Sequence, residues 1–394
     1  MRIVALILMG ALAACSTPER QKREQQDLLT LRAEAAYRTG AETQQVIDRL
    51  LARAKAEHDA HVAGRRPQPP RIDILVISGG GDWGAFGASF LKGWGKVPAS
   101  HPLARPQFDA VTGVSTGALI APFAFLGTDE ALDSIVGLYR NPQDDWVKER
   151  GWLFFLPNNA SFAEVPGLER EVRKHVTLDM LRRIVAAEGG GRLLLVNTTN
   201  LDDSSARVFD LIAEARRAVE SADTSRVHNI MLASAGIPAA FPHRELDGQM
   251  YVDGGVTGNI VYGGQVREEE SLAARWQSRY PGLPIPKMRF WVIFNNQVRM
   301  APAVVRPRWP DIIARSMELS SRSATLPALR HLHAMSEISR LKRKADIEVR
   351  MVAVPDNWVP PVPGVFIKES MNALADLGDH MGADPASWST EPPL

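Results

Sequence analysis

The stretch that decides the fold runs from residue 108 to residue 126 and reads FDAVTGVSTGALIAPFAFL. Its first five residues are typical of a short strand, and residues 116–126 form an apolar run of helical length. Between them lies the pentapeptide G-x-S-x-G with Ser115 at its centre. A strand, a sharp turn and a helix are the setting that a nucleophile elbow requires. We therefore predict that Ser115 is a nucleophile.

The two glycines of the pentapeptide, Gly113 and Gly117, have a steric role in this prediction. An elbow holds its serine in a strained backbone conformation, in which neighbouring side chains would collide with the strand or the helix. The helix that begins at Thr116 also directs its free N–H groups and the positive end of its dipole toward Ser115. The elbow is thus expected to supply part of an oxyanion hole.

A second glycine-rich turn lies one strand earlier. Residues 72–77 are typical of a buried strand, residues 84–94 of a helix, and SGGGDWG joins them at residues 78–84. The backbone amides of such a turn can bind an oxyanion.

The same glycines also fit the dinucleotide pattern G-x-G-x-x-G, from Gly79 to Gly84. That pattern requires an acidic residue about 20 positions further on. The sequence offers His101 and Arg105 there, which disfavours a nucleotide site.

The third segment, GQMYVDGG at residues 248–255, is typical of a short strand that ends in Asp253. A serine hydroxyl needs a base within hydrogen-bond reach, and a carboxylate that is shielded from water can accept its proton. We predict that Asp253 is this base. The alternative is that Asp253 only caps a turn through the backbone N–H groups that follow it, as Asp-Gly sequences commonly do.

These motifs, in this order, resemble the patatin-like phospholipase family over roughly residues 71–300. The resemblance implies an α/β fold of three layers, with a mainly parallel sheet and helices on both faces. It also implies a serine lipid acyl hydrolase that uses a Ser–Asp dyad, forms an acyl-enzyme and needs no histidine. The residues that carry the resemblance are Gly79, Gly80, Gly81 and Gly84 of the loop, Gly113, Ser115, Thr116 and Gly117 of the elbow, residues 198–201 and 233–242, Asp253 with Gly254 and Gly255, and Asn259.

Carried over to this sequence, the resemblance implies Ser115 as nucleophile and Asp253 as base. The implied oxyanion hole consists of backbone amides of Gly79, Gly80, Gly81 and Thr116. Two positions depart from the family pattern, because Ser78 and Trp83 stand where family members usually carry Asp and a cation. The missing cation leaves open how the loop is braced, and it favours a neutral lipid or another ester over an anionic head group.

Two other interpretations keep the same motifs. A Ser–His–Asp esterase would need His175, His228 or His243, although the Asp-Gly-Gly run comes last in the chain, unlike the usual order Ser, Asp, His. A catalytically silent envelope scaffold would keep the fold and lose the activity. No cofactor is expected, and no metal, since no motif such as H-E-x-x-H is present.

Composition agrees with a globular enzyme. The chain has 394 residues, of which 45% are hydrophobic and 23% charged, enough for one large α/β core. Its formal net charge of +1 and scattered basic residues argue against nucleic acid as a partner. A lipid or another acyl ester is the expected substrate. The apolar segment 152–156 could line an acyl pocket, lie beneath a lid or pack in the core.

The start of the chain has the features of a lipoprotein signal peptide over residues 1–14. A basic residue precedes an apolar stretch too short for an ordinary membrane span, and Leu-Ala-Ala-Cys at residues 12–15 looks like a bacterial lipobox. We therefore expect acylation of Cys15, the single cysteine, as a membrane anchor. Ser16 follows instead of Asp, and the resemblance to sorted lipoproteins then implies the cell envelope, at the outer membrane facing the periplasm, as the expected location.

The remaining boundaries follow from composition. Residues 15–70 are expected to form a lipidated arm, with two amphipathic helices over residues 16–64 and a stiff Pro-rich linker from residue 65. The arm could pack on the catalytic domain, act as a spacer or bind a protein partner. The patatin-like catalytic domain is expected over residues 71–355. A Pro-rich C-terminal tail with one helix follows at residues 356–394.

Overall fold

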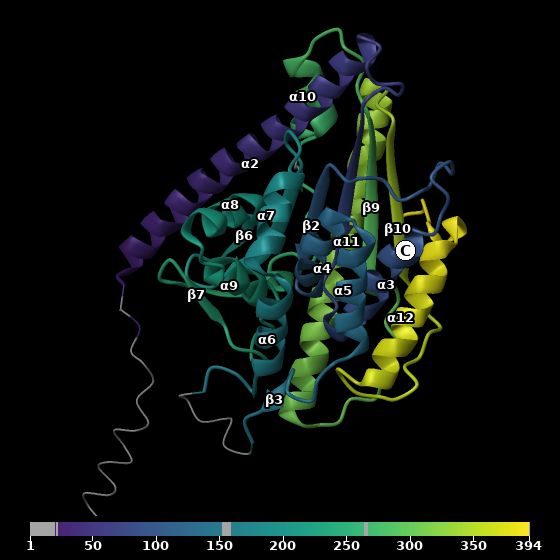
Figure 1. Cartoon of the computed structure of the whole chain (residues 1–394). Helices are drawn as coiled ribbons and strands as arrows, with labels where there is room; N and C mark the ends of the chain where they lie inside the picture. Colours follow the sequence, from purple (N-terminus) through teal and green to yellow (C-terminus); the bar gives the residue numbers. More distant parts are fainter. Residues whose placement is uncertain (1–19, 21–22, 152–158, 264–266, 394) are drawn as a thin grey trace, which may run out of the picture.

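The computed structural model describes Arg20 and residues 23–151, 159–263 and 267–393. The predicted signal peptide, Cys15 and the apolar segment 152–156 lie outside these residues. The described part is built around one eight-stranded sheet with helices on both sides (Figure 1).

Most of this sheet is parallel. Its five neighbouring parallel strands are, in spatial order, β10 (Ile347–Val354), β9 (Lys287–Gln297), β1 (Arg71–Ile77), β2 (Ala110–Val114) and β5 (Leu193–Asn200). The antiparallel end consists of β6 (Ser205–Asp210), β7 (Arg244–Leu246) and β8 (Gln249–Asp253). The mainly parallel sheet predicted from the sequence is therefore confirmed.

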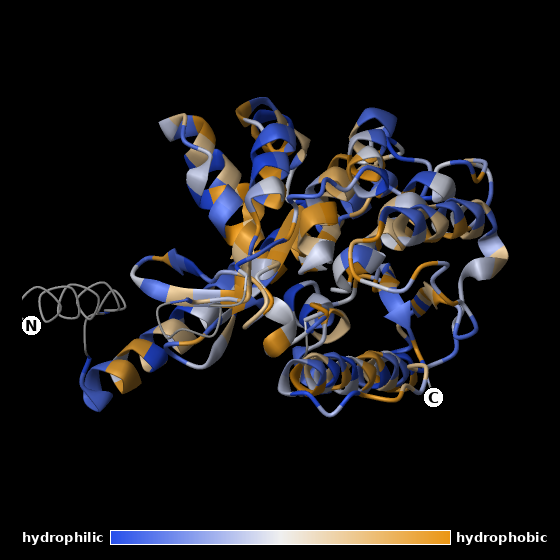
Figure 2. Cartoon of the chain, turned by 90° about the horizontal axis from the view of Figure 1, so that it is seen from below, coloured by the Kyte–Doolittle hydropathy of each residue, from blue (hydrophilic) through white to orange (hydrophobic). Residues whose placement is uncertain are grey.

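Side chains alternate between the two faces of the sheet, and each face has its own core. In β1, Leu75 and Ile77 enter the larger core, whereas Ile72, Ile74 and Val76 enter the smaller one. Hydrophobic colours accordingly gather between the layers in Figure 2. The three-layer architecture is confirmed.

The larger core is covered by α3 (Gly84–Trp94), α4 (Thr116–Leu126), α5 (Asp129–Arg140), α6 (Pro166–His175), α7 (Leu178–Ala187), α8 (Leu211–Ser221), α9 (Ser225–Ser234) and α12 (Lys368–Ala383). The smaller core is covered by α2 (Gln25–Val62), α10 (Leu272–Arg279) and α11 (Trp309–Arg343). The shorter elements are β3 (Lys148–Glu149), β4 (Ala163–Glu164), η1 (Gly81–Trp83), η2 (Gly254–Val256), η3 (Glu268–Glu270) and η4 (Pro385–Ser387).

The predicted pair of amphipathic helices is one continuous helix, so that prediction is wrong. α2 runs without interruption through Gly40, where the apolar stripe of the sequence is broken. A single glycine costs a helix only about 1 kcal/mol relative to alanine, and α2 contains no proline. The helix packs on the domain through Leu50, Leu51 and Ala54, which are buried in the smaller core. The arm thus packs on the catalytic domain through this part of α2.

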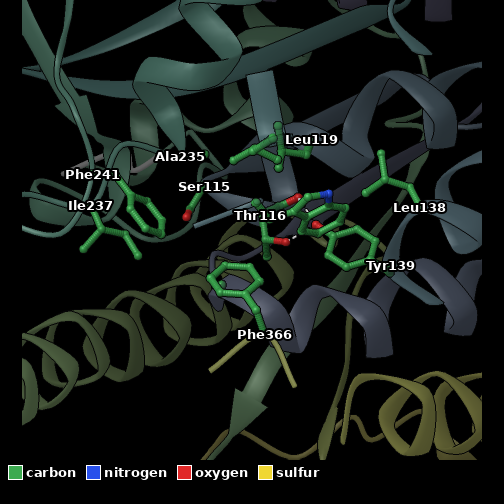
Figure 3. Close-up of a pocket in the computed structure, with 12 residues that line it drawn as sticks. Ser115, Thr116, Leu119, Leu138, Tyr139, Ala235, Ile237, Phe241 and Phe366 are labelled. Carbon is green, nitrogen blue, oxygen red and sulfur yellow. Dashed lines mark hydrogen bonds between the residues drawn. The ribbon is translucent and has the colours of Figure 1, made fainter. Parts of the chain in front are cut away.

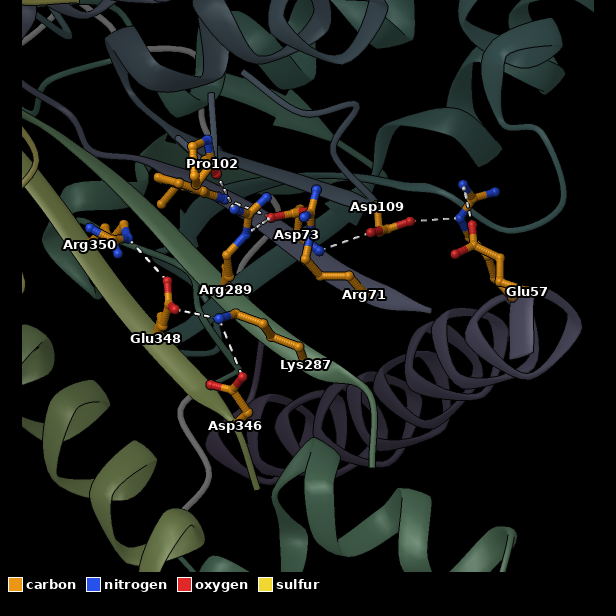
Figure 4. A network of polar contacts seen from close by, with 12 residues as sticks. Glu57, Arg71, Asp73, Pro102, Asp109, Lys287, Arg289, Asp346, Glu348 and Arg350 are labelled. Atoms are coloured by element: carbon orange, nitrogen blue, oxygen red, sulfur yellow. Dashed lines mark hydrogen bonds and ion pairs between the residues drawn. The ribbon is translucent and has the colours of Figure 1, made fainter. Parts of the chain in front are cut away.

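Charged side chains hold the edge of the sheet at which the parallel strands begin (Figure 4). Asp73 of β1 accepts hydrogen bonds from Arg289 Nε at 2.6 Å and from Arg71 Nε at 2.7 Å. Asp109, just before β2, accepts from the Asp73 backbone N–H at 2.9 Å and from Arg53 Nε of α2 at 2.8 Å. The network thus joins α2 to the sheet at the edge opposite to the glycine-rich turns.

The C-terminal segment packs closely on α3. Side chains at Gly378 and Gly382 of α12 would collide with backbone carbonyls of α3, so both glycines allow the two helices to touch. Beyond α12, Trp388 packs against Trp94 and Trp291, and Ser389 pairs with Met351 of β10. The helix predicted for the tail is present and extends to Ala383.

Candidate active site

The two glycine-rich turns leave the sheet side by side. β1 and β2 are parallel neighbours, with Ile77 in register with Gly113, so the loop after Ile77 and the elbow after Val114 meet at one edge. This is the edge at which open parallel sheets usually bind ligands.

Asp253 reaches the same place through the antiparallel part of the sheet. β6 pairs with residues 195–200 of β5 and occupies one edge of that strand. β2 and β8 therefore share the other edge end to end, with Val114 opposite Asn197 and Asp253 opposite Thr198. The end of β2 and the end of β8 are thus adjacent, and this arrangement places Ser115 beside Asp253.

Ser115 has the strained backbone expected for an elbow, with φ 53° and ψ −124°. Its backbone N–H donates a hydrogen bond to Ser234 Oγ at 3.0 Å, and Ser234 Oγ donates to the Asn197 carbonyl at 2.6 Å. The elbow also requires glycine at position 117, because a side chain there would collide with the Ile77 carbonyl. The left-handed turn is therefore fixed by α9 and β5 as well as by its own glycines.

Asp253 is buried, and its two carboxylate oxygens have different surroundings. Oδ1 accepts a hydrogen bond from the Gly255 backbone N–H at 2.7 Å, which is the turn cap considered as the alternative role. Oδ2 is buried and has no hydrogen-bond partner of ordinary geometry among the described residues. The backbone of Asp253 is also held by two hydrogen bonds. Its N–H donates to the Gly236 carbonyl and its carbonyl accepts from Thr199 Oγ1, each at 2.9 Å.

Burial raises the pKa of Asp253 from 3.8 to about 6. The Ser115 hydroxyl opposes this effect as a side-chain donor, and so does the Gly255 N–H. Ser115 is thus close enough to act on the carboxylate without forming a hydrogen bond of ordinary geometry. Asp253 can therefore both cap the turn and face the hydroxyl.

The glycine loop provides fewer free amides than predicted. The Gly79 N–H donates to Asn259 Oδ1 at 3.0 Å, so the assignment of Gly79 to the oxyanion hole is wrong for this structure. In the described residues, no acceptor is bonded to the N–H groups of Gly80, Gly81 or Thr116. These three amides stay candidates for binding an oxyanion.

Uncharged contacts and one carboxylate brace the loop in place of the missing cation. Ser78 Oγ accepts from the Asn295 N–H at 2.9 Å, and Trp83 packs edge-on against Trp358 with ring centroids 5.0 Å apart. Asp82 Oδ2 accepts from the Phe366 N–H at 2.9 Å. Burial raises the pKa of Asp82 to about 6, although hydrogen bonds from the backbone N–H groups of Phe366, Asp82 and Trp83 act to lower it.

An apolar pocket opens beside Ser115 (Figure 3). Tyr139 is buried at its wall and shares a short hydrogen bond with Thr116 Oγ1. Burial raises the pKa of the Tyr139 hydroxyl, which keeps it neutral. Such a wall suits an acyl chain or another apolar group next to the nucleophile. The lining residues are Gly81, Ser115, Thr116, Leu119, Leu138, Tyr139, Trp146, Leu168, Ala235, Ile237, Phe241 and Phe366.

The histidines considered for a triad have other surroundings. His175 Nδ1 lies 2.8 Å from Ser134 Oγ, and His228 Nε2 lies 2.7 Å from the Val176 carbonyl. His243 forms no hydrogen bond with Ser115 or Asp253 in the described part of the chain. The geometry therefore gives the triad no support.

The described residues also bear on metal binding and on membrane spanning. Their His, Cys, Asp and Glu side chains do not form any group of three that could hold a metal ion. Within the same ranges, none of the helices combines the length and the apolar character needed to span a bilayer.

Several supporting residues were not assigned a role from the sequence. Ser234 and Asn197 hold the elbow, Thr199 holds Asp253, and Phe366 completes the pocket. Ser234 lies within the family-like segment 233–242, which was the available signal. Phe366 lies beyond the predicted catalytic domain, more than a hundred positions after Asp253. No sequence signal indicated a role for it.

The chain was also compared with known proteins. Residues 75–263 match the family model described as Patatin-like phospholipase, and no curated protein matches the chain. The matched part contains Ser115 and Asp253, whereas α11 and α12 lie beyond it. A domain of this kind implies lipid acyl hydrolase activity in general. Sequence motifs, fold and family model agree that residues 75–263 are similar to a patatin-like phospholipase domain.

Proposed function

We propose that the protein is a serine lipid acyl hydrolase that works through Ser115 and Asp253. One observation carries the proposal: the Ser115 hydroxyl, which is held in a strained turn and lines an apolar pocket, acts on the buried carboxylate of Asp253, whose Oδ2 has no partner of ordinary geometry among the described residues. Burying a carboxylate oxygen without a hydrogen-bond partner costs free energy, and groups perturbed in this way cluster at functional sites.

In the proposed reaction, Asp253 takes the proton of Ser115 Oγ as that oxygen attacks the ester carbonyl carbon. The carbonyl oxygen becomes an oxyanion, which the N–H groups of Gly80, Gly81 and Thr116 stabilise together with the dipole of α4. The C–O bond to the alcohol then breaks, and the alcohol leaves with the proton from Asp253.

The acyl-enzyme is released by the same steps in reverse order. Asp253 removes a proton from water, and the resulting oxygen nucleophile attacks the acyl carbon. The bond to Ser115 Oγ breaks, Ser115 recovers the proton, and the fatty acid leaves. The pocket in Figure 3 would hold the acyl chain through both halves.

The test is hydrolysis of short and long p-nitrophenyl esters and of phosphatidylethanolamine vesicles by the chain from Ser16 onward, beside Ser115→Ala and Asp253→Asn. Both variants should lose about 10³-fold or more in kcat/KM while remaining folded. His243→Ala is the control and should keep most activity. A fluorophosphonate should label the wild type and not Ser115→Ala. A folded wild type that neither labels nor hydrolyses any ester would leave the silent scaffold.

We also propose that the protein is anchored in the cell envelope through an acylated Cys15, at the outer membrane. The support is the sequence of residues 2–16 alone. Processing that stops on addition of globomycin, and on Cys15→Ser substitution, is the expected result. Processing that is insensitive to both would contradict the anchor.

A further inference from the structure

A long exposed segment follows β9. Every residue from 301 to 310 is exposed, and the charged residues between 298 and 310 are all arginines: Arg299, Arg306 and Arg308. Apolar side chains share this exposure, because Val304 is fully exposed and Trp309 is 58% exposed. Ile312 and Ile313 continue it on the first turns of α11. Exposed apolar side chains gathered beside positive charges are typical of an interaction surface.

A second exposed segment follows β10, over residues 355–367. It has no charged residue between Asn357 and Ile367. Val359 is 74% exposed and Val365 is 70% exposed, and prolines stiffen the stretch between them.

Hydrogen bonds join the two segments at their starts. Gln297 Nε2, at the end of β9, donates to the carbonyls of Pro355 at 3.0 Å and Trp358 at 2.7 Å. The Arg299 N–H donates to Asp356 Oδ1 at 2.9 Å. Because β9 and β10 are parallel to β1 and β2, both segments emerge at the edge of the sheet that carries Ser115.

The same segments also reach the site itself. Phe366, next to the exposed Val365, lines the pocket beside Ser115 (Figure 3). On α11, Ser321 Oγ lies 3.7 Å from the position that a Cβ of Gly255 would occupy. The exposed surface is therefore continuous with the mouth of the candidate active site.

We propose that residues 298–313 and 355–367 together form a docking face for the surface of an anionic lipid bilayer. Exposed valines and isoleucines can enter the boundary between head groups and acyl chains, and tryptophan favours that depth. Arg299 and Arg308, whose side chains form no ion pair among the described residues, match negatively charged head groups, whereas Arg306 is paired with Asp311. Docking on this face would point the Ser115 pocket at the bilayer; the delivery of substrate rests on the proposed function, whereas the binding itself does not.

The experiment measures binding to vesicles of phosphatidylcholine with and without phosphatidylglycerol. The protein is the chain from Ser16 onward, which keeps every described residue and lacks the predicted anchor. The wild type and Ser115→Ala should bind the anionic vesicles equally well. Val304→Ser and Val359→Ser should each weaken this binding several-fold, and Arg308→Ala should weaken it about fivefold on anionic vesicles only.

Leu341→Ser is the matched control, because Leu341 is 75% exposed near the opposite end of α11. It should bind like the wild type. Equal binding by all variants, or equal loss in Leu341→Ser, would overturn the docking face. So would a dimer of the wild type that Val304→Ser or Val359→Ser dissociates, since the face would then hold a second copy.

Hydrolysis separates this inference from the proposed function. Val304→Ser and Val359→Ser should cleave a short soluble p-nitrophenyl ester at the wild-type rate and vesicle lipids several-fold more slowly. Vesicle binding without any ester hydrolysis would sustain the docking face and defeat the proposed function. If both variants hydrolysed both substrates at wild-type rates, the proposed function would stand and the docking face would be overturned.

Discussion

The Asp82 carboxylate accepts a hydrogen bond from the Phe366 backbone N–H at 2.9 Å, across 284 positions of sequence. The bond ties the glycine loop, which would hold the oxyanion, to the segment that supplies one wall of the pocket. Two parts of the candidate site are therefore held in a fixed relation by one buried carboxylate.

This link predicts that Asp82→Ala lowers both stability and long-chain activity. The Phe366 N–H would lose its acceptor, which costs about 1–3 kcal/mol, and the pocket wall would no longer be fixed. Asp82→Asn keeps an oxygen acceptor and should stay near the wild type. Thermal unfolding and KM for a long p-nitrophenyl ester check the pair. Equal behaviour of the two variants would show that the hydrogen bond is not what matters.

Asp82 should also make stability depend on pH. Its pKa rises from 3.8 to about 6 on folding, so between these values the native state binds more protons than the unfolded state. The free energy of unfolding should therefore fall as pH rises through this window, by at most about 3 kcal/mol for this group. Urea unfolding across the window measures it. Asp253, whose pKa also rises to about 6, contributes a similar slope, so Asp82→Asn should reduce the slope by about half. An unchanged slope would show that Asp82 does not contribute.

The activity should have the opposite pH dependence, because Asp253 must be ionised to accept a proton. Its pKa of about 6 predicts that kcat/KM rises with pH, reaches half its maximum near that value and then levels off. Rates on a short p-nitrophenyl ester across this range are the measurement. His243→Ala should leave the profile in place; a profile that moves with this substitution would favour the triad.

Ser234→Ala should impair the elbow without touching the substrate. It removes the acceptor of the Ser115 N–H, an effect of about 1–3 kcal/mol, so kcat should fall about 5- to 150-fold. KM for a short ester should change little, because Ser234 does not line the pocket. Ser89→Ala is the control, since Ser89 is a buried serine whose hydroxyl has no partner among the described residues. Equal kinetic losses in both variants would contradict a positioning role.

The contact of α2 with the domain predicts a stability effect. Leu51 is buried in the smaller core, and Leu51→Ala should lower the free energy of unfolding by about 2–5 kcal/mol. Tyr37→Ala, at an exposed position of the same helix, should have little effect. Urea denaturation compares them. If Leu51→Ala unfolds like the wild type, α2 does not depend on this contact in solution.

Local sequence patterns predicted the elements that carry the motifs. The helices at residues 84–94 and 116–126 have the predicted bounds, because continuous apolar runs begin there at glycine-rich turns. The strained φ of Ser115 also follows from a local pattern, the G-x-S-x-G turn. Order along the chain was then enough to indicate which turns belong to one site.

Contacts between distant segments could not be predicted in the same way. Asn259 takes the Gly79 amide from 180 positions away, so the sequence assigned that amide to the oxyanion hole. Phe366 enters the pocket from beyond the motifs, and no periodicity marks it. The sequence also could not show that α2 continues through Gly40. Whether one glycine ends a helix depends on tertiary packing, which the stripe of apolar residues does not reveal.

Trp388, close to the end of the chain, completes an aromatic cluster with Trp94 and Trp291. This core is therefore complete only when the segment around Trp388 lies against α3 and β9, more than a hundred positions after Asp253 in the sequence. A product shortened by a premature stop before Trp388 would retain Ser115 and Asp253, yet its open core would make it a substrate for proteases rather than an enzyme.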